Sequence, residues 1–147
     1  MKHIVIIATF CLYFFSCNQE KINPASFGSC NGSILTDSLS MCANFIGTWN
    51  WTERYCPCCS GAKPTKADKE VTATFNPDAT FSVSEDLKII DTGKWEVLKT
   101  SNGFALSISP LATDDFYLQG SITICDNQLV ADMSFLDGCE HLFIKAD

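Results

Sequence analysis

Histidine is scarce in this 147-residue chain, and basic residues are outnumbered by acidic ones. The two histidines are His3 and His141, and 10 Lys and Arg residues stand against 17 Asp and Glu residues, a formal net charge of −7 at pH 7. A nucleic-acid-binding surface needs a basic stripe, and anionic lipid head groups also attract basic segments. The charge balance therefore argues against both kinds of partner.

The sequence motifs of common enzyme classes are lacking as well. No serine stands in a nucleophile-elbow context, and no Gly-rich phosphate loop is present. The carboxylate pairs Glu85-Asp86 and Asp114-Asp115 fall in expected turns, where solvation is the ordinary state of such groups. Because a general base that titrates near neutral pH is hard to nominate, we expect a non-enzymatic protein without a cofactor. The strongest enzymatic alternative would use His141 beside Asp132 or Glu140.

Hydrophobic runs are too short to span a bilayer, which takes about 20 apolar residues. The longest run, residues 4–15, is interrupted only by Thr9, follows a short basic start, and ends at Ser16 and Cys17. Such a run is typical of a secretory signal. Its Ser16-Cys17 end resembles a lipobox, the site at which bacterial lipoproteins are cleaved and acylated. An ordinary secretory signal cut further on, or a short membrane anchor, is the alternative.

The lipobox resemblance implies a signal peptide at residues 1–16 and a lipid anchor at Cys17. Acyl chains on that cysteine would hold the protein on a membrane of the bacterial cell envelope. We therefore expect an outer-membrane lipoprotein that faces the periplasm or the cell surface. Residues 17–44 would form a polar tether and N-terminal segment, with a short helix at Leu35–Ala43, and residues 45–147 would form the folded domain.

The folded domain has the pattern of an all-β protein. Short runs of alternating apolar and polar residues are separated by turn sequences such as Asn76–Ala79, Ser101–Gly103 and Asp126-Asn127. About eight strands joined by short turns indicate an antiparallel meander, which closes or doubles to protect its edges. We expect an up-and-down barrel, with a sandwich as the alternative. The predicted strands cover residues 46–55, 70–75, 80–84, 87–90, 94–99, 104–108, 116–125, 128–135 and 139–145.

Several short motifs resemble those of lipocalin-like (calycin-type) bacterial lipoproteins. Gly47-Thr48-Trp49 opens the first predicted strand, as the Gly-x-Trp motif does in lipocalins, and Gly93-Lys94-Trp95 repeats it. The hairpin over residues 71–81 and Asp137-Gly138 before the last strand are similar too. Lipocalins commonly place an Arg near the chain end over the first-strand Trp, and Lys145 would take that position here. The resemblance implies a barrel that binds a small apolar ligand.

Aromatic residues at inward positions of such a barrel either fill it or line a pocket for one ligand. A pocket of a few hundred Å³ lined by aromatics would favour a lipid-anchored, lipocalin-like ligand-binding protein, which is the function we expect. A filled barrel with an exposed apolar loop patch would favour the alternative, a structural or inhibitory lipoprotein that contacts a protein partner through its loops. The oligomeric state is not indicated. The residues predicted to contact the ligand are Trp49, Trp51, Phe75, Phe81, Trp95 and Phe104.

Nine cysteines complete the pattern, of which seven follow Cys17. In an exported protein they form disulfides by default. The closely spaced Cys56, Cys58 and Cys59 would also suit a soft metal ion as thiolates, and a metal-binding function is kept as a further alternative.

Barrel topology predicts which cysteines meet. In a closed meander the first and last strands are antiparallel neighbours, so the end of the first strand lies beside the start of the last. Cys139 should therefore be linked to Cys56 or Cys58. The same reasoning places Cys125 at the opposite end together with Cys42, as a disulfide pair, with Cys30 as a further candidate neighbour.

Overall fold

The computed structural model describes residues 35–56, 63–110, 117–118, 120–133 and 138–147. The predicted signal peptide and the predicted lipidation site at Cys17 lie outside the described residues. So do Cys30, Cys58 and Cys59. No helix within the described part of the chain is both long and apolar enough to cross a membrane.

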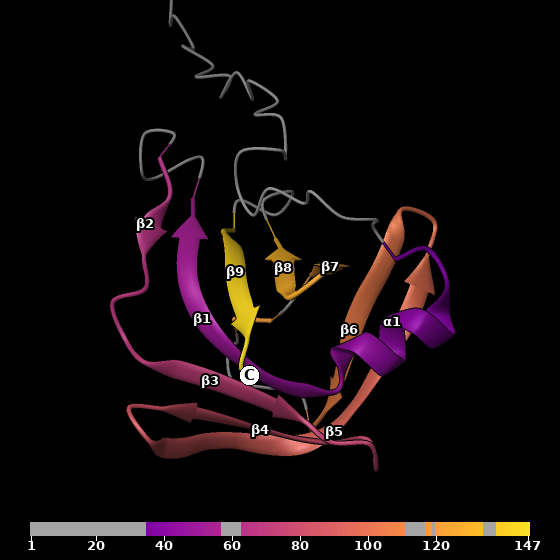
Figure 1. Cartoon of the computed structure of the whole chain (residues 1–147), viewed down its shortest axis with the longest axis horizontal. Helices are drawn as coiled ribbons and strands as arrows, with labels where there is room; N and C mark the ends of the chain where they lie inside the picture. Colours follow the sequence, from indigo (N-terminus) through magenta and orange to yellow (C-terminus); the bar gives the residue numbers. More distant parts are fainter. Residues whose placement is uncertain (1–34, 57–62, 111–116, 119, 134–137) are drawn as a thin grey trace, which may run out of the picture.

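Eight antiparallel strands form a closed barrel, which confirms the predicted architecture (Figure 1). The strands pair in chain order, and the last returns to pair with the first. A short extra strand, β2 (Thr65–Lys66), extends the sheet beside β1. The barrel strands are β1 (Gly47–Tyr55), β3 (Val71–Phe75), β4 (Thr80–Glu85), β5 (Lys88–Thr100), β6 (Gly103–Ser109), β7 (Ser121–Cys125), β8 (Gln128–Asp132) and β9 (Glu140–Lys145).

One strand differs from the sequence-based expectation. The two predicted strands over residues 87–90 and 94–99 are a single strand, β5. Its pairing with β4 skips Ile90, which forms a β-bulge and interrupts the period-two alternation. The β4–β5 turn consists of Asp86 and Leu87, both with positive φ angles of 49° and 67°. Consecutive positive φ angles are those of the two-residue turns that match the twist of a hairpin.

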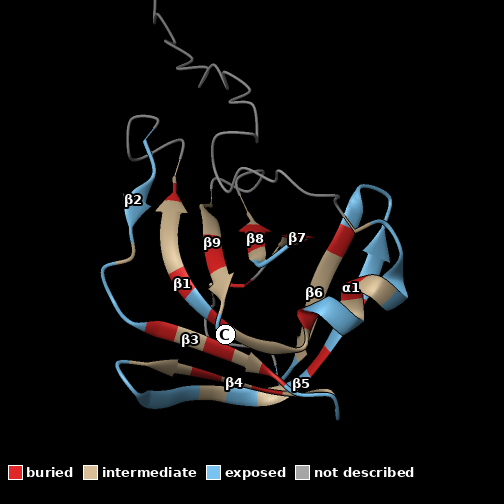
Figure 2. Ribbon diagram, viewed as in Figure 1, coloured by how far each residue is buried: buried red, intermediate tan, exposed pale blue. Residues whose placement is uncertain are grey.

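The core fills the interior of the barrel, because alternate residues of each strand point inward. In β3 the buried residues are Val71, Ala73 and Phe75, with the intervening threonines partly exposed. The same alternation places Phe81 and Val83 of β4 inside. Figure 2 shows these buried positions as red segments along the strands.

The helix α1 (Ser38–Phe45) precedes the barrel and packs into it. It begins at Ser38 because the side chain of Asp37 accepts a hydrogen bond of 2.8 Å from the Ser40 backbone N–H, as an N-cap does. The predicted helix over 35–43 is therefore present but shifted toward the strand. The helix contacts β5 and β7, and its Met41 and Phe45 are buried in the barrel core.

Candidate functional site

The barrel end covered by α1 is filled with aromatic rings rather than open. Phe45 lies with its ring centroid 4.3 Å from that of Phe75 and 5.3 Å from that of Trp95. Phe75 in turn contacts Trp95 edge-on at 5.7 Å and Phe81 at 6.1 Å. These rings are buried. Two of the residues predicted to contact a ligand, Phe75 and Trp95, therefore pack against Phe45, a helix residue that strand periodicity does not find, and a third, Phe81, packs against Phe75.

Trp49 belongs to the same packed end. Its indole Nε1 donates a buried hydrogen bond of 2.8 Å to the carbonyl oxygen of Phe45. The ammonium of Lys145 lies 5.1 Å from the Trp49 ring centroid, which is the placement that the lipocalin resemblance implied for Lys145. Trp49 is fully buried and does not line either of the two cavities described below.

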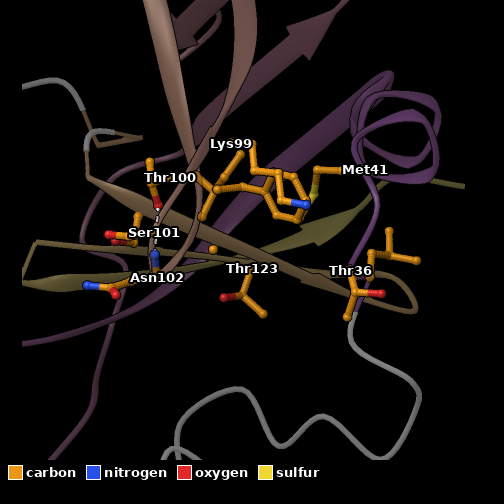
Figure 3. A pocket seen from close by; sticks show the side chains of 12 residues that line it. Thr36, Met41, Lys99, Thr100, Ser101, Asn102 and Thr123 are labelled. Carbon is orange, nitrogen blue, oxygen red and sulfur yellow. Dashed lines mark hydrogen bonds between the residues drawn. The ribbon is translucent and has the colours of Figure 1, made fainter.

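A cavity of about 410 Å³ lies next to this packed end, between α1, the β5–β6 hairpin and β7 (Figure 3). Met41, Phe104 and Ile122 provide a buried apolar floor, and Leu35 adds an apolar edge. Phe104 is the one predicted ligand-contact residue that lines it. Strand alternation identified Phe104 as inward-facing, but the opposite wall comes from the helix.

Polar side chains surround this apolar floor. Of the described residues that line the cavity, only Lys99 is charged, and in Figure 3 its side chain extends across the cavity toward Met41. The remaining lining residues are Gly103, which has no side chain, and six residues with hydroxyl or amide groups: Thr36, Thr100, Ser101, Asn102, Ser121 and Thr123. The arrangement can hold a molecule that has an apolar part and a polar part.

Trp51 lies at the other end of the barrel, in a second cluster of rings. Its ring centroid is 4.6 Å from that of Tyr117 and 5.6 Å from that of His141. The Tyr117 hydroxyl donates a hydrogen bond of 3.4 Å to Glu85, and Lys69 forms an ion pair of 2.8 Å with the same carboxylate. Here too side chains pack together, so the predicted ligand set is divided between two ends of the barrel.

His141 is held neutral in this cluster. Burial lowers its pKa from 6.5 to about 4, and the positive charge of Arg54 acts in the same direction. Its Nδ1 is buried and has no hydrogen-bond partner among the described residues. Arg54 faces it directly in the pairing of β1 with β9.

The carboxylates proposed to assist His141 lie on the other face of the sheet. Asp132 pairs with Glu140 across β8 and β9, whereas His141 pairs with Ala131. Neighbouring residues in a strand point to opposite faces. Burial raises the pKa of Glu140, and the charge of Asp132 raises it further. The alternative constellation of His141 beside Asp132 or Glu140 is therefore not formed.

A second groove, of about 580 Å³, borders β1, β2 and the start of β3. It includes Trp51, but its other lining residues are mostly charged and carry both signs. Arg54 and Asp68 form an exposed ion pair of 3.4 Å beside it. This groove offers less apolar surface to a ligand than the cavity beneath α1.

The cysteines follow the predicted topology in part. Cys56 and Cys139 form a disulfide with their Cα atoms 4.3 Å apart, as the pairing of the first and last strands predicted. The Cys56 sulfur is in this bond and cannot act as a thiolate ligand. The alternative of a metal site that uses Cys56, Cys58 and Cys59 together is therefore wrong. No cluster of three or more potential metal ligands occurs among the residues that the structure describes.

The predicted link between Cys125 and Cys42 is wrong. Cys42 has a free thiol, whereas Cys125 is in a disulfide. Cys42 lies on α1 and packs against the core. Strand topology locates strand ends, but it does not determine which side of a preceding helix faces them.

Comparisons with protein-family models, with curated proteins and with solved structures find no match for this chain. The class of protein is therefore defined by the fold alone. It is a closed eight-stranded antiparallel barrel with one extra strand, and this fold is compatible with a lipocalin-like one.

Proposed function

We propose that this chain is a lipocalin-like, lipid-anchored protein of the bacterial cell envelope that binds a small, mainly apolar ligand without catalysis. The observation that carries the proposal is the cavity of about 410 Å³ over Met41, Phe104 and Ile122. Its volume falls in the range of small-molecule sites, about 300–1,000 Å³. The proposed site lies beneath α1, beside the packed aromatic core rather than within it.

Ligand binding can be tested with a fluorescent apolar probe such as N-phenyl-1-naphthylamine. The purified protein should enhance its emission, and Thr123→Trp, which places a large ring at the cavity, should abolish the enhancement. Thr92→Trp is the matched control, because Thr92 is exposed on β5 and does not line the cavity. Equal probe binding by both variants would contradict the proposed site.

Membrane attachment is supported by the apolar run at residues 4–15 and by Ser16-Cys17. In a host that processes lipoproteins, the protein should partition into the detergent phase of a Triton X-114 extract. Cys17→Ser should leave it unprocessed or in the aqueous phase. An unchanged distribution of the variant would end the claim of lipidation.

A second candidate function, contact with a protein partner, is favoured by the β4–β5 hairpin. Leu87 is 87% exposed, and Ile89 and Ile90 are 64% and 49% exposed (Figure 2). Leu87 also has a positive φ, which bulky residues rarely adopt. The hairpin therefore holds several apolar side chains in solvent, as docking surfaces do.

This candidate can be tested by placing a photo-crosslinking amino acid at position 87 in producing cells. A discrete adduct that is lost in Ile89→Thr/Ile90→Thr, and absent when the crosslinker replaces exposed Leu98, would favour the partner. Equal labelling at positions 87 and 98 would count against it.

A further inference from the structure

We propose that the cavity beneath α1 selects amphiphiles with an anionic head group and a single apolar chain, and that Lys99 determines this specificity. The inference rests on the proposed function, because it names the class of ligand that the same cavity takes. Two features of the cavity support it, the charged side chain of Lys99 and the apolar floor.

Lys99 is exposed, but it continues the series of inward-facing positions of β5 at the rim of the barrel. In β5 the residues two and four positions before it, Val97 and Trp95, are buried in the core, and side chains two apart share a face. Lys99 also pairs with Phe104 of β6, whose ring forms part of the cavity floor. A lysine thus stands at the position where the apolar interior ends and the cavity begins.

Several lysines of the described chain have a partner for the ammonium group, whereas those of Lys66, Lys88 and Lys99 have none, and of these three only Lys99 lines the cavity. Lys69 pairs with Glu85, Lys145 donates to the Asn44 carbonyl oxygen, and Lys94 donates to the Asp78 carbonyl oxygen. Lys99 has no hydrogen bond or ion pair with any residue that the structure describes. Its charge is therefore available to a ligand.

The surroundings favour a negative charge beside that ammonium. No Asp or Glu lines the cavity among the residues that the structure describes, although acidic residues outnumber basic ones in the chain by 17 to 10. The Thr100 hydroxyl oxygen accepts a hydrogen bond of 3.3 Å from the Asn102 backbone N–H, which leaves the O–H proton of Thr100 to donate. Hydrogen bonds from an ammonium or a hydroxyl to an anion are stronger than those between neutral groups.

The apolar floor of the cavity favours a ligand whose remaining part, beyond the head group, is apolar. Met41, Phe104 and Ile122 are each almost fully buried and offer no hydrogen bond from their side chains. An alkyl chain laid over them would lose contact with water, and burial of each methylene favours binding. A cavity of about 410 Å³ suits one such chain. The head group would then lie at Lys99 and Thr100.

The experiment compares ligands of equal chain length by displacement of the fluorescent probe. Dodecanoate should bind about tenfold more tightly than dodecanol, as expected for one added charge-assisted hydrogen bond, and dodecyltrimethylammonium should bind least. Dodecyl phosphate separates the two anion chemistries: a gain over dodecanoate assigns a phosphate head group, and a loss assigns a carboxylate.

Variants of Lys99 isolate the charge from the alkyl stem. Lys99→Met keeps an apolar stem of similar length and should weaken dodecanoate binding about tenfold while leaving dodecanol binding unchanged. Lys99→Arg should retain the preference. The matched control is Lys88→Met, an exposed lysine of the same strand that does not line the cavity.

Two outcomes would overturn the inference but leave the proposed function standing. In one, dodecanoate and dodecanol bind equally to the wild type. In the other, Lys99→Met weakens both ligands to the same extent, because Lys99 would then act by packing alone. If no amphiphile binds, or if Thr123→Trp binds as the wild type does, the proposed function itself fails.

Discussion

The ammonium of Lys145 lies 5.1 Å from the ring centroid of Trp49 and donates a hydrogen bond of 2.8 Å to the carbonyl oxygen of Asn44. The Trp49 indole donates to the next carbonyl along the chain, that of Phe45. The last carbonyl groups of a helix have no partners within the helix, and a cation beside them is favourable. Side chains of β1 and β9 therefore fasten the end of α1 to the barrel.

Replacement of Lys145 should loosen this attachment. We expect Lys145→Met to lower the free energy of unfolding by about 1–2 kcal/mol, because it removes both a cation–π contact and a charge at a helix C-terminus. Lys145→Arg should retain most of the stability, since a guanidinium makes both interactions. Urea denaturation measures the difference, with exposed Lys88→Met as the control. Equal losses for the Met and Arg variants would contradict the role of the charge.

The glycine of the Gly-x-Trp motif has a physical reason in this structure. Gly47 has a φ of +133°, and a Cβ there would lie 2.8 Å from Cε of Lys145. Gly47→Ala should therefore lower the free energy of unfolding by about 1–3 kcal/mol through backbone strain. A further loss of stability should follow because the new Cβ displaces Lys145 from Trp49.

A second glycine, Gly103, separates the effect of backbone strain from the effect of displacing Lys145. Gly103 has a similar φ of +136°, but a Cβ there would meet nothing within 4 Å. Gly103→Ala should report the backbone strain alone, and Gly47→Ala should destabilise the protein more in urea denaturation. In a Lys145→Ala background, in which position 145 has no atom beyond Cβ, the excess should disappear. An excess that persists would mean that Lys145 is not its cause.

The strand topology could be predicted from the sequence because each hairpin depends on the residues of its own turn. Short turns such as Asp126-Asn127 fix which strands are neighbours, and closure of the meander then brings Cys56 beside Cys139. The continuity of β5 was missed because the bulge at Ile90 adds one residue, and a single extra residue reverses the inward and outward positions that follow.

The candidate site was predicted less well because one wall of the cavity comes from outside the sheet. Strand alternation correctly identified inward residues, including Phe104, but it cannot tell whether a helix residue fills the space between them. Phe45 occupies the region that Phe75 and Trp95 would otherwise leave open. Lys99 was missed because a single lysine near a turn has the same sequence pattern as a solvated one.

The Cys56–Cys139 disulfide should contribute strongly to stability. It joins residues 83 positions apart, and closing a loop of this length in the unfolded chain contributes on the order of 4 kcal/mol. The double variant Cys56→Ala/Cys139→Ala should show this loss in urea denaturation under oxidising conditions. Cys42→Ala, which removes a free thiol, should have a much smaller effect. Similar losses for the two would contradict the assigned bond.

Acid should destabilise the protein through His141. Its pKa of about 4 in the folded state is lower than the ordinary value of 6.5, so the unfolded chain binds the proton more readily between these values. The stability that depends on neutral His141 is complete above about pH 6.5 and is lost as the pH falls toward 4. The difference between the two pKa values corresponds to about 3 kcal/mol.

The matched variant is His141→Phe, which keeps a ring between Trp51 and Tyr117 but removes the titrating group. Between about pH 7 and pH 4, the free energy of unfolding of the wild type should fall by about 3 kcal/mol more than that of the variant. Glu140 acts in the opposite direction, because its raised pKa favours the folded state as acid is added, but it is present in both proteins. Proton NMR gives a direct check, since His3 is the only other histidine: the His141 ring should stay neutral at pH 5. Parallel stability curves for the two proteins would mean that His141 is solvated, and that Trp51, Tyr117 and Arg54 do not hold it in its neutral form.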